Sequence, residues 1–306
     1  MKVSVVLCTY SPDMYEHFLE AAESVLAQTY SDVELVVVVD GTESVYERAV
    51  EDLGDDERTR IHLNDENVGL LESRNTGAEL ASGDVVAFID DDAVPAPDWI
   101  EALVDVYGRR DAIAAGGKMV GEWVAGEPGF LPEEFYWLVG VTHRGFADGE
   151  SEVRNTFGSN ISFDREVFLE MDGFDSDIGG RKGDKNLQGG ETELCARIRS
   201  VYDEGVWYTP EARVAHKVFE YRTRPTWLLE RAFWQGYSKR AMETLVGESA
   251  DEESAYLGQL LGTFLPARLR GLVSAPSVTA VLQLLFLLVL TGTVGLGYAY
   301  GLLRWR

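Results

Sequence analysis

Short apolar runs of strand length alternate with amphipathic segments through the first 120 residues. The runs are VSVVLC (3–8), ELVVVV (34–39), DVVAFI (84–89) and the weaker RIHL (60–63). The segments between them carry apolar residues at helical spacing: MYEHFLEAAESVLAQ (14–28), TESVYERAVEDL (42–53) and GLLESRNTGAELAS (69–82). This alternation predicts an α/β fold, a mostly parallel sheet with helices on both faces.

Polar residues follow three of these predicted strands directly. In sheets of this kind ligands bind outside the carboxyl ends of the strands. The residues at these ends are Thr9, Tyr10, Asp40, Asp90, Asp91 and Asp92. The first strand is followed by TYSPD and not by a GxGxxG loop, which disfavours a dinucleotide-binding dehydrogenase.

The Asp90–Asp92 triplet repels phosphate unless a divalent cation stands between them. Two carboxylates spaced as Asp90 and Asp92 project to the same side of an extended segment, which suits Mg²⁺ or Mn²⁺ with a diphosphate. A solvated acidic turn is the alternative, but the position between an apolar strand and AVPAPDW favours a metal. On the helix predicted at 69–82, Arg74 and Asn75 either position such a diphosphate or lie on a solvated face.

Several segments, in this order, resemble the inverting glycosyltransferases of the GT-A fold, family 2, over roughly residues 2–240. The segments are VSVVLCTYSP, ELVVVVD, NVGLLESRNTGAELASGDVVAFIDDDAVP, GSNISFDREVFLEMDGFD, GGETELCARI and YTPEARVAHKV. The fold expected from the resemblance is a GT-A (Rossmann-like) sheet. The expected activity is metal-dependent hexosyl transfer from a nucleotide sugar. Asp90 and Asp92 would form the family's DxD motif.

The resemblance also implies the site residues. The donor-binding residues would be Thr9, Tyr10, Asp40, Arg74, Asp90 and Asp91, and the metal ligands would be Asp90, Asp92 and His216. Glu191 occupies the place of the family's catalytic Asp, and Gly190 stands where the family has Glu. This departure leaves the general base between Glu191 and Glu193.

The chain has 52 acidic against 27 basic residues and a formal net charge of −25. A surface of this charge repels nucleic acid, so we expect no nucleic-acid partner. Only six of the basic residues are lysine, and the combination predicts a halophilic protein, because salt screens the self-repulsion. A merely acidic mesophilic protein is the alternative.

From Gly271 to Leu303 the chain carries no charged residue. The run exceeds the roughly 20 apolar residues that cross a bilayer, and it predicts a transmembrane or membrane-embedded segment. A buried core helix or a hairpin lying in the interface is the alternative. Arginines flank both ends of this segment, so the distribution of positive charges does not indicate which end faces the cytoplasm.

Residues 221–240 reverse the sign of the chain's charge. Cations and aromatic rings interleave there, against the single acid Glu230: Arg222, Arg224, Trp227, Arg231, Phe233, Trp234, Tyr237, Lys239 and Arg240. Such a pattern suits a membrane interface, although an amphipathic core helix with a solvated basic face is the alternative. We therefore expect a catalytic domain at 1–220, a basic and aromatic interfacial helical segment at 221–270, and the membrane segment at 271–303.

The segment WQGYSKRA, with the apolar tail, resembles family members that build lipid-linked oligosaccharides. The Gln-x-x-Arg-Trp motif of processive synthases is missing, which favours a single sugar transfer. The function that this resemblance implies is transfer of one hexose or hexuronic acid from a UDP-linked donor to a dolichyl-phosphate-linked saccharide in N-glycosylation of surface-layer glycoprotein. The predicted location is the cell membrane, with the catalytic domain on the cytoplasmic side. A polyprenyl-phosphate hexose synthase and an inactive membrane scaffold are the alternatives.

Overall fold

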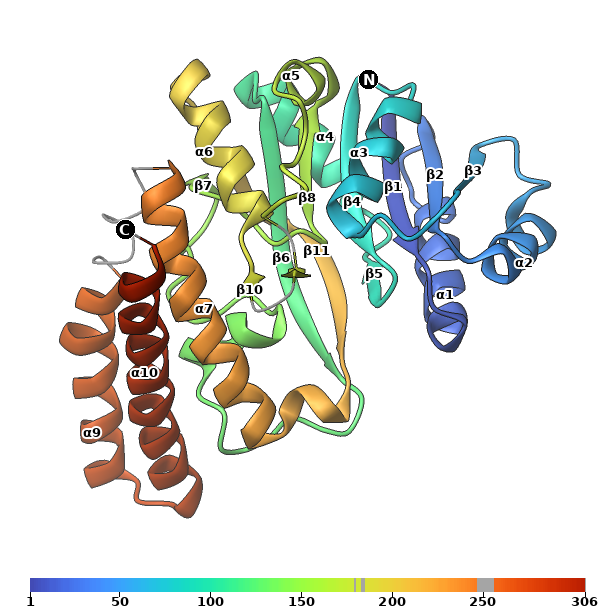
Figure 1. The fold of residues 1–306 in the computed structure, drawn as a ribbon. Coiled ribbons are helices and arrows are strands. Elements are labelled where there is room, and N and C mark those ends of the chain that lie inside the picture. Colours follow the sequence, from blue (N-terminus) through green and yellow to red (C-terminus); the bar gives the residue numbers. More distant parts are fainter. Residues whose placement is uncertain (179, 183–184, 247–255, 306) are drawn as a thin grey trace. The chain divides into compact units, whose positions relative to one another are not determined.

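The computed structural model describes residues 1–178, 180–182, 185–246 and 256–305 (Figure 1). The chain divides into two compact units. The first consists of Met1–Val120, Gly149–Gly179 and Gly190–Lys217, and the second of Gly121–Asp148, Gly180–Gly189 and Val218–Arg306. Three stretches of the predicted 1–220 domain, 121–148, 180–189 and 218–220, thus group with the C-terminal unit. Residues 247–255 of the predicted 221–270 segment lie outside the described residues.

The first unit is built on a mixed nine-stranded sheet. Its N-terminal half is parallel and has the order β3-β2-β1-β4. These strands are β1 (Val3–Thr9), β2 (Val33–Asp40), β3 (Thr59–Asn64) and β4 (Val85–Asp90). Each contains one of the predicted apolar runs, so the expected α/β fold is confirmed.

Beyond β4 the sheet continues with antiparallel pairs between β4 and β8, β8 and β6, and β11 with both β5 and β7. These strands are β5 (Ala93–Pro95), β6 (Ala114–Trp123), β7 (Ser151–Val153), β8 (Ile161–Asp164) and β11 (Val206–Val218). In the second unit a separate hairpin pairs β9 (Gly180–Lys182) with β10 (Lys185–Leu187). The parallel order expected from the N-terminal pattern therefore covers only part of the sheet.

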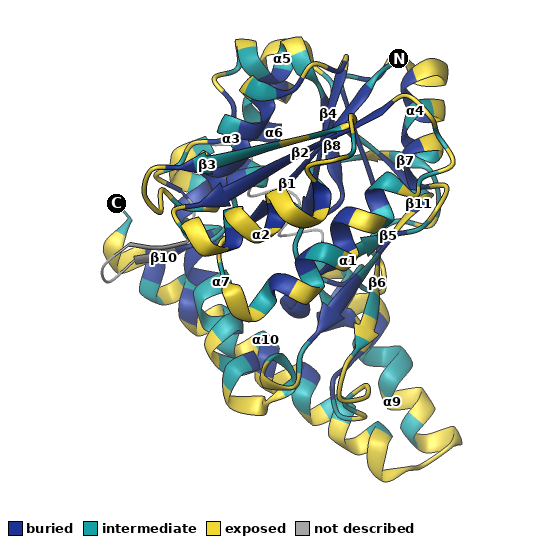
Figure 2. Ribbon diagram, turned by 90° about the vertical axis from the view of Figure 1, so that its right-hand side faces the viewer, coloured by how far each residue is buried: buried dark blue, intermediate teal, exposed yellow. Residues whose placement is uncertain are grey.

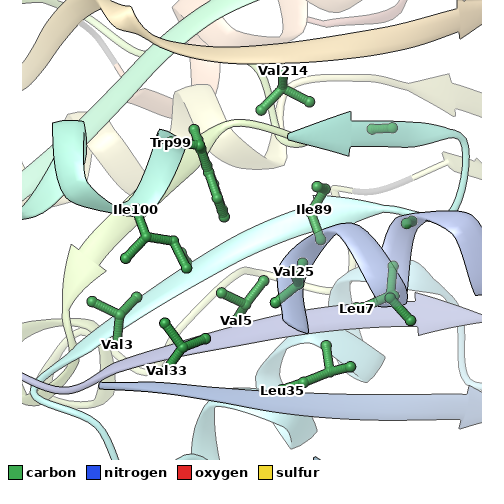
Figure 3. Packing of buried hydrophobic residues seen from close by; sticks show 14 of the residues in the cluster. Val3, Val5, Leu7, Val25, Val33, Leu35, Ile89, Trp99, Ile100 and Val214 are labelled. Carbon is green, nitrogen blue, oxygen red and sulfur yellow. The ribbon is translucent and has the colours of Figure 1, made fainter. Parts of the chain in front are cut away.

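Helices cover both faces of the sheet. They are α1 (Tyr15–Leu26, preceded by the 3₁₀ turn Pro12–Met14), α2 (Glu43–Leu53), α3 (Leu70–Leu80), α4 (Trp99–Arg110), α5 (Arg165–Glu170) and α6 (Gly190–Tyr202). Side chains alternate between the faces of a strand. Val3, Val5 and Leu7 therefore pack with α1, α2 and α4 (Figure 3), while Val6 and Cys8 pack with α3, α5 and α6.

The second unit is mainly helical. Its elements are η2 (Glu133–Val139), η3 (Glu220–Thr223), α7 (Pro225–Val246), the π-turn η4 (Leu260–Phe264), α9 (Leu265–Ser274) and α10 (Val278–Arg304). A core of its own joins η2, α7 and α10 through Phe135, Leu228, Leu287 and Leu290. Helix α7 confirms the helical pattern predicted after residue 221.

The uncharged run is divided between α9 and α10, which Figure 1 shows as an antiparallel pair. The break lies at Ala275–Ser277, where Pro276 cannot continue a helix and Ser277 caps α10 by accepting a hydrogen bond from the Ala280 amide. Among the described residues, α10 is the one helix long and apolar enough to cross a membrane. Its best 18-residue window has a mean hydropathy of 2.1 and is only 11% buried.

Candidate active site

The parallel register brings the ends of three strands together within the first unit. Cys8 lies opposite Asp90, and Thr9 lies opposite Val39, which precedes Asp40. The predicted polar residues therefore meet at one edge of the sheet. Cys8 is buried, which raises the pKa of its thiol to about 12, so this sulfur stays protonated and is no nucleophile.

The three aspartates of the triplet have three different partners. Asp91 and Asp92 form a turn between β4 and β5, so the extended geometry expected there is wrong. Asp90 accepts hydrogen bonds from Arg74 (2.6 Å) and from the Ser159 hydroxyl (2.7 Å), one on each carboxylate oxygen. The Asp91 carboxylate accepts from the Thr9 hydroxyl at 3.1 Å.

Arg74 lies at the centre of the site and is only 1% exposed. Its Nη2 donates to Asp90 and to the carbonyl of Gly158, and its Nη1 donates to Glu191 Oε1 at 2.9 Å. Burial alone would lower the pKa of this guanidinium, but the charges of Asp90 and Glu191 outweigh burial and raise it. Arg74 therefore holds two carboxylates that come from α6 and the end of β4.

The two candidate bases on α6 point to different surroundings. Glu191 meets Arg74, and its side chain remains 24% exposed. Glu193 is buried and forms a bidentate ion pair with Arg197, one helical turn further on. Residues two apart on a helix do not share a face, so only Glu191 belongs to the site.

Asp92 and His216 form a buried pair. Ala93 of β5 pairs with His216 of β11, and the Lys217 amide donates to the carbonyl of Asp92. This pairing brings His216 Nε2 to 3.4 Å from Asp92 Oδ1, with both side chains 6% exposed.

The donor set fits a hard divalent cation that takes most of its ligands from elsewhere. Among the residues that the structure describes, no three His, Cys, Asp or Glu side chains are grouped so as to hold a metal ion. Mg²⁺ in particular is usually held by one or two carboxylates together with substrate phosphates and water. Asp92 supplies one such carboxylate and His216 adds an imidazole nitrogen beside it. Each oxygen of Asp90 accepts one hydrogen bond, and Asp90 stays a predicted ligand.

Asp40 is 5% exposed and accepts hydrogen bonds from the amides of Val68 and Gly69 and from the side chain of Asn64. It therefore fixes the loop that leads into α3. Its contact with a nucleotide stays a prediction, and so does that of Tyr10, which is 59% exposed.

Asn75 does not face the site carboxylates. Its amide exchanges two hydrogen bonds with the backbone of Phe174, each 2.8 Å long. This pairing ties α3 to the segment after α5, so Asn75 does not lie on a solvated face, and its contact with a diphosphate stays a prediction.

Gly158 and Ser159 open one of the segments that resemble the family, but neither residue was predicted to belong to the site. A Cβ at Gly158 would lie 2.1 Å from Glu191 Oε1 and 2.8 Å from Arg74 Nη1, so a larger residue there would displace the ion pair from its present position. Ser159 supplies the hydroxyl that holds Asp90. The sequence signal that could have indicated them is Gly158-Ser159-Asn160, which lies directly before the strand at Ile161–Asp164.

The chain resembles known proteins in both sequence and fold. The family model described as Glycosyl transferase family 2 matches residues 4–171. The chain is 55% identical over 304 residues to a glucosyl-dolichyl phosphate glucuronosyltransferase of Haloferax volcanii, covering 99% of this chain and 97% of that protein. An uncharacterized glycosyltransferase of Haemophilus influenzae is 31% identical over 44% of this chain and 41% of its own length.

Two solved structures share the fold. A mannosyltransferase from Pyrobaculum calidifontis, PcManGT, in complex with GDP-Man and Mn²⁺ superposes with a TM-score of 0.59 at 17% identity, covering 98% of this chain and 87% of that one. Residues 1–349 of Staphylococcus aureus TarS in complex with UDP give 0.57 at 15% identity, covering 97% and 89%. The family match over more than half of the chain, with the near full-length relative, shows that this chain belongs to glycosyl transferase family 2.

Proposed function

We propose that this protein is an inverting glycosyltransferase that moves glucuronic acid from a UDP-linked donor to glucosyl-dolichyl phosphate. The identity of 55% with the Haloferax volcanii enzyme over 99% of the chain supports both the sugar and the lipid. The observation that carries the proposal is the convergence of Glu191, Arg74 and Asp90 at the carboxyl edge of the sheet.

Glu191 is the proposed general base. An acceptor hydroxyl must lose its proton as it attacks, whereas a bare lipid phosphate is already anionic. Glu191 is exposed enough to reach an acceptor, and Arg74 fixes the orientation of its carboxylate. Because only a sugar hydroxyl needs a general base, the presence of Glu191 favours a lipid-linked sugar as the acceptor over bare polyprenyl phosphate.

Asp92 and His216 are the proposed metal ligands on the donor side. A bound Mg²⁺ or Mn²⁺ would stabilise the charge that develops on the departing diphosphate. The solved relative that contains GDP-Man and Mn²⁺ supports a divalent ion in this fold. Asp90 and Asp91, held by Arg74 and Thr9, would complete the donor-facing wall of the site.

Membrane association follows from the nature of the acceptor. The apolar helix α10 and the basic, aromatic residues of α7 support it. We propose that the catalytic unit lies on the cytoplasmic side, where nucleotide sugars are available, and that the product enters N-glycan assembly.

The test is a product analysis. Purified protein in lipid vesicles at high salt is given UDP-glucuronic acid, Mn²⁺ and either glucosyl-dolichyl phosphate or bare dolichyl phosphate, and the lipids are identified by mass spectrometry. The proposal expects one added hexuronic acid on the glucosylated lipid. Transfer to the bare phosphate alone would support the polyprenyl-phosphate hexose synthase, and no transfer to either lipid would support an inactive scaffold.

A further inference from the structure

Helix α10 packs against its own unit along its whole length. Near its start, the Phe286 ring lies 4.5 Å from that of Phe130, in the segment before η2. In the second half of α10, its backbone comes close to that of α7, since a Cβ at Gly297 would lie 1.9 Å from the Phe233 carbonyl oxygen. At its end, the Trp305 and Tyr237 rings lie 6.2 Å apart.

The segments that accompany α10 are polar and partly irregular. Beside its first turns, the fully buried carboxylate of Glu134 is paired with Arg268 at 2.6 Å, and Arg268 also donates to Gln283 of α10. Near its end, Glu243 accepts hydrogen bonds from Arg240 at 3.0 Å and from the Tyr298 hydroxyl at 2.7 Å.

These neighbours are incompatible with α10 crossing a bilayer. A crossing α10 would take η2, α7 and their charged groups into the hydrocarbon with it. Irregular backbone and charged side chains are not tolerated at that depth where they face lipid, and Glu133 of η2 and Glu230 of α7 are exposed.

The outward faces of α9 and α10 are apolar and cationic. Large apolar side chains are exposed on them, and Figure 2 shows much of α9 as exposed: Leu269, Val273, Val278, Val281, Leu282, Leu285, Leu288, Val289, Leu296, Leu302 and Leu303. None of the chain's 52 carboxylates lies after Glu253. The exposed charges on these helices are Arg270 and Arg304. Apolar side chains with flanking arginines complement an anionic lipid surface.

We propose that α9 and α10 lie in the plane of the membrane, as a monotopic docking surface, and that α10 does not span it. The inference rests on the membrane-bound acceptor of the proposed function. It places both chain termini on the same side of the membrane and lets a lipid-linked acceptor reach the protein from within one leaflet.

Depth measurements test this orientation. Cys8 and Cys195 are buried and are replaced by alanine, and single cysteines at Val281, Leu288 or Leu296 carry an environment-sensitive fluorophore. The full-length protein is bound to phosphatidylcholine and phosphatidylglycerol vesicles whose acyl chains carry bromine at defined depths. Leu290→Cys, whose native side chain faces the protein with 0% exposure, is the matched control.

An in-plane helix predicts the same shallow depth at all three exposed positions, about 5–10 Å below the headgroups, and weak quenching at the control. A profile that is deepest at Leu288 and shallower toward the helix ends would show a crossing helix and overturn the inference, while leaving glycosyl transfer intact. Failure to bind vesicles would also overturn it and would remove membrane docking from the proposed function. Product analysis with detergent-dispersed acceptor then decides separately whether the transfer reaction stands.

Discussion

Arg74 and Glu191 are 117 residues apart in the chain and form an ion pair of 2.9 Å beneath the sheet edge. The same guanidinium binds Asp90 at 2.6 Å, so a single buried cation orients the proposed base Glu191 and the carboxylate of Asp90 together. Removing one partner of such a pair leaves a buried charge without compensation. The geometry of the proposed base thus depends on residues that need not touch either substrate.

Gly158→Ala tests that dependence. The added methyl group would collide with Glu191 Oε1, at 2.1 Å, and displace the carboxylate from Arg74. A displacement of about 1 Å costs on the order of 10²-fold in rate, and we expect that loss in turnover. Gly149→Ala is the control, because a Cβ there would meet nothing within 4 Å. Equal turnover of the two variants in steady-state assays would contradict the positioning role.

Asp92→Asn tests the proposed metal site. Loss of one carboxylate should weaken Mn²⁺ activation by more than the ~10–100-fold that removal of an outer-shell partner causes. The measurement is a Mn²⁺ titration of activity, with the circular dichroism spectrum as a check on folding. A wild-type enzyme that remains fully active in EDTA would refute metal dependence altogether.

His143 predicts a pH dependence of stability. Burial, and then the charge of Lys239, lowers the pKa of His143 from 6.5 to about 4. The unfolded chain therefore binds a proton that the folded chain does not, and stability falls as the pH drops from about 6.5 toward about 4. In urea titrations across this range, His143→Gln should lose less stability than the wild type. Parallel curves would show that His143 does not contribute.

Low salt should destabilise the protein. The net charge of −25 repels itself over a screening length that grows from about 3 Å at 1 M to about 10 Å at 0.1 M salt. Thermal unfolding followed by circular dichroism should show a melting temperature that rises steadily with KCl. A melting temperature independent of KCl would argue for an ordinary acidic protein.

The strands and helices of the N-terminal half could be predicted because apolar periodicity records which face of each element is buried. VSVVLC becomes β1 and GLLESRNTGAELAS contains α3 with small shifts in the ends. Within the antiparallel half of the sheet, β5, β7 and β8 could not be predicted in this way, since they have only three or four residues each. A strand of three or four residues is too short to show a clear alternation of apolar and polar residues.

The side-chain partners could be predicted only where they are local. Glu193 and Arg197 are four residues apart on a helix, and this spacing was available to assign their ion pair. The ion pairs of Arg74 depend on how α3, α6 and β4 pack, which no local pattern records. For the same reason the sequence placed Asp90 and Asp92 together, while the turn at Asp91–Asp92 gives them different partners.

The most direct test of the proposed reaction is the turnover of Glu191→Gln with UDP-glucuronic acid and glucosyl-dolichyl phosphate, followed by mass spectrometry of the lipid product. Glu193→Gln is the matched control, since Glu193 pairs with Arg197 and not with Arg74. We predict that Glu191→Gln loses on the order of 10²–10⁴ in turnover, because it removes the base, while its affinity for the donor stays unchanged. Glu193→Gln should have the wild-type turnover once its activity is corrected for the fraction of protein that is folded. Near wild-type turnover of Glu191→Gln would contradict Glu191 as the base and, with it, the sugar hydroxyl as the nucleophile.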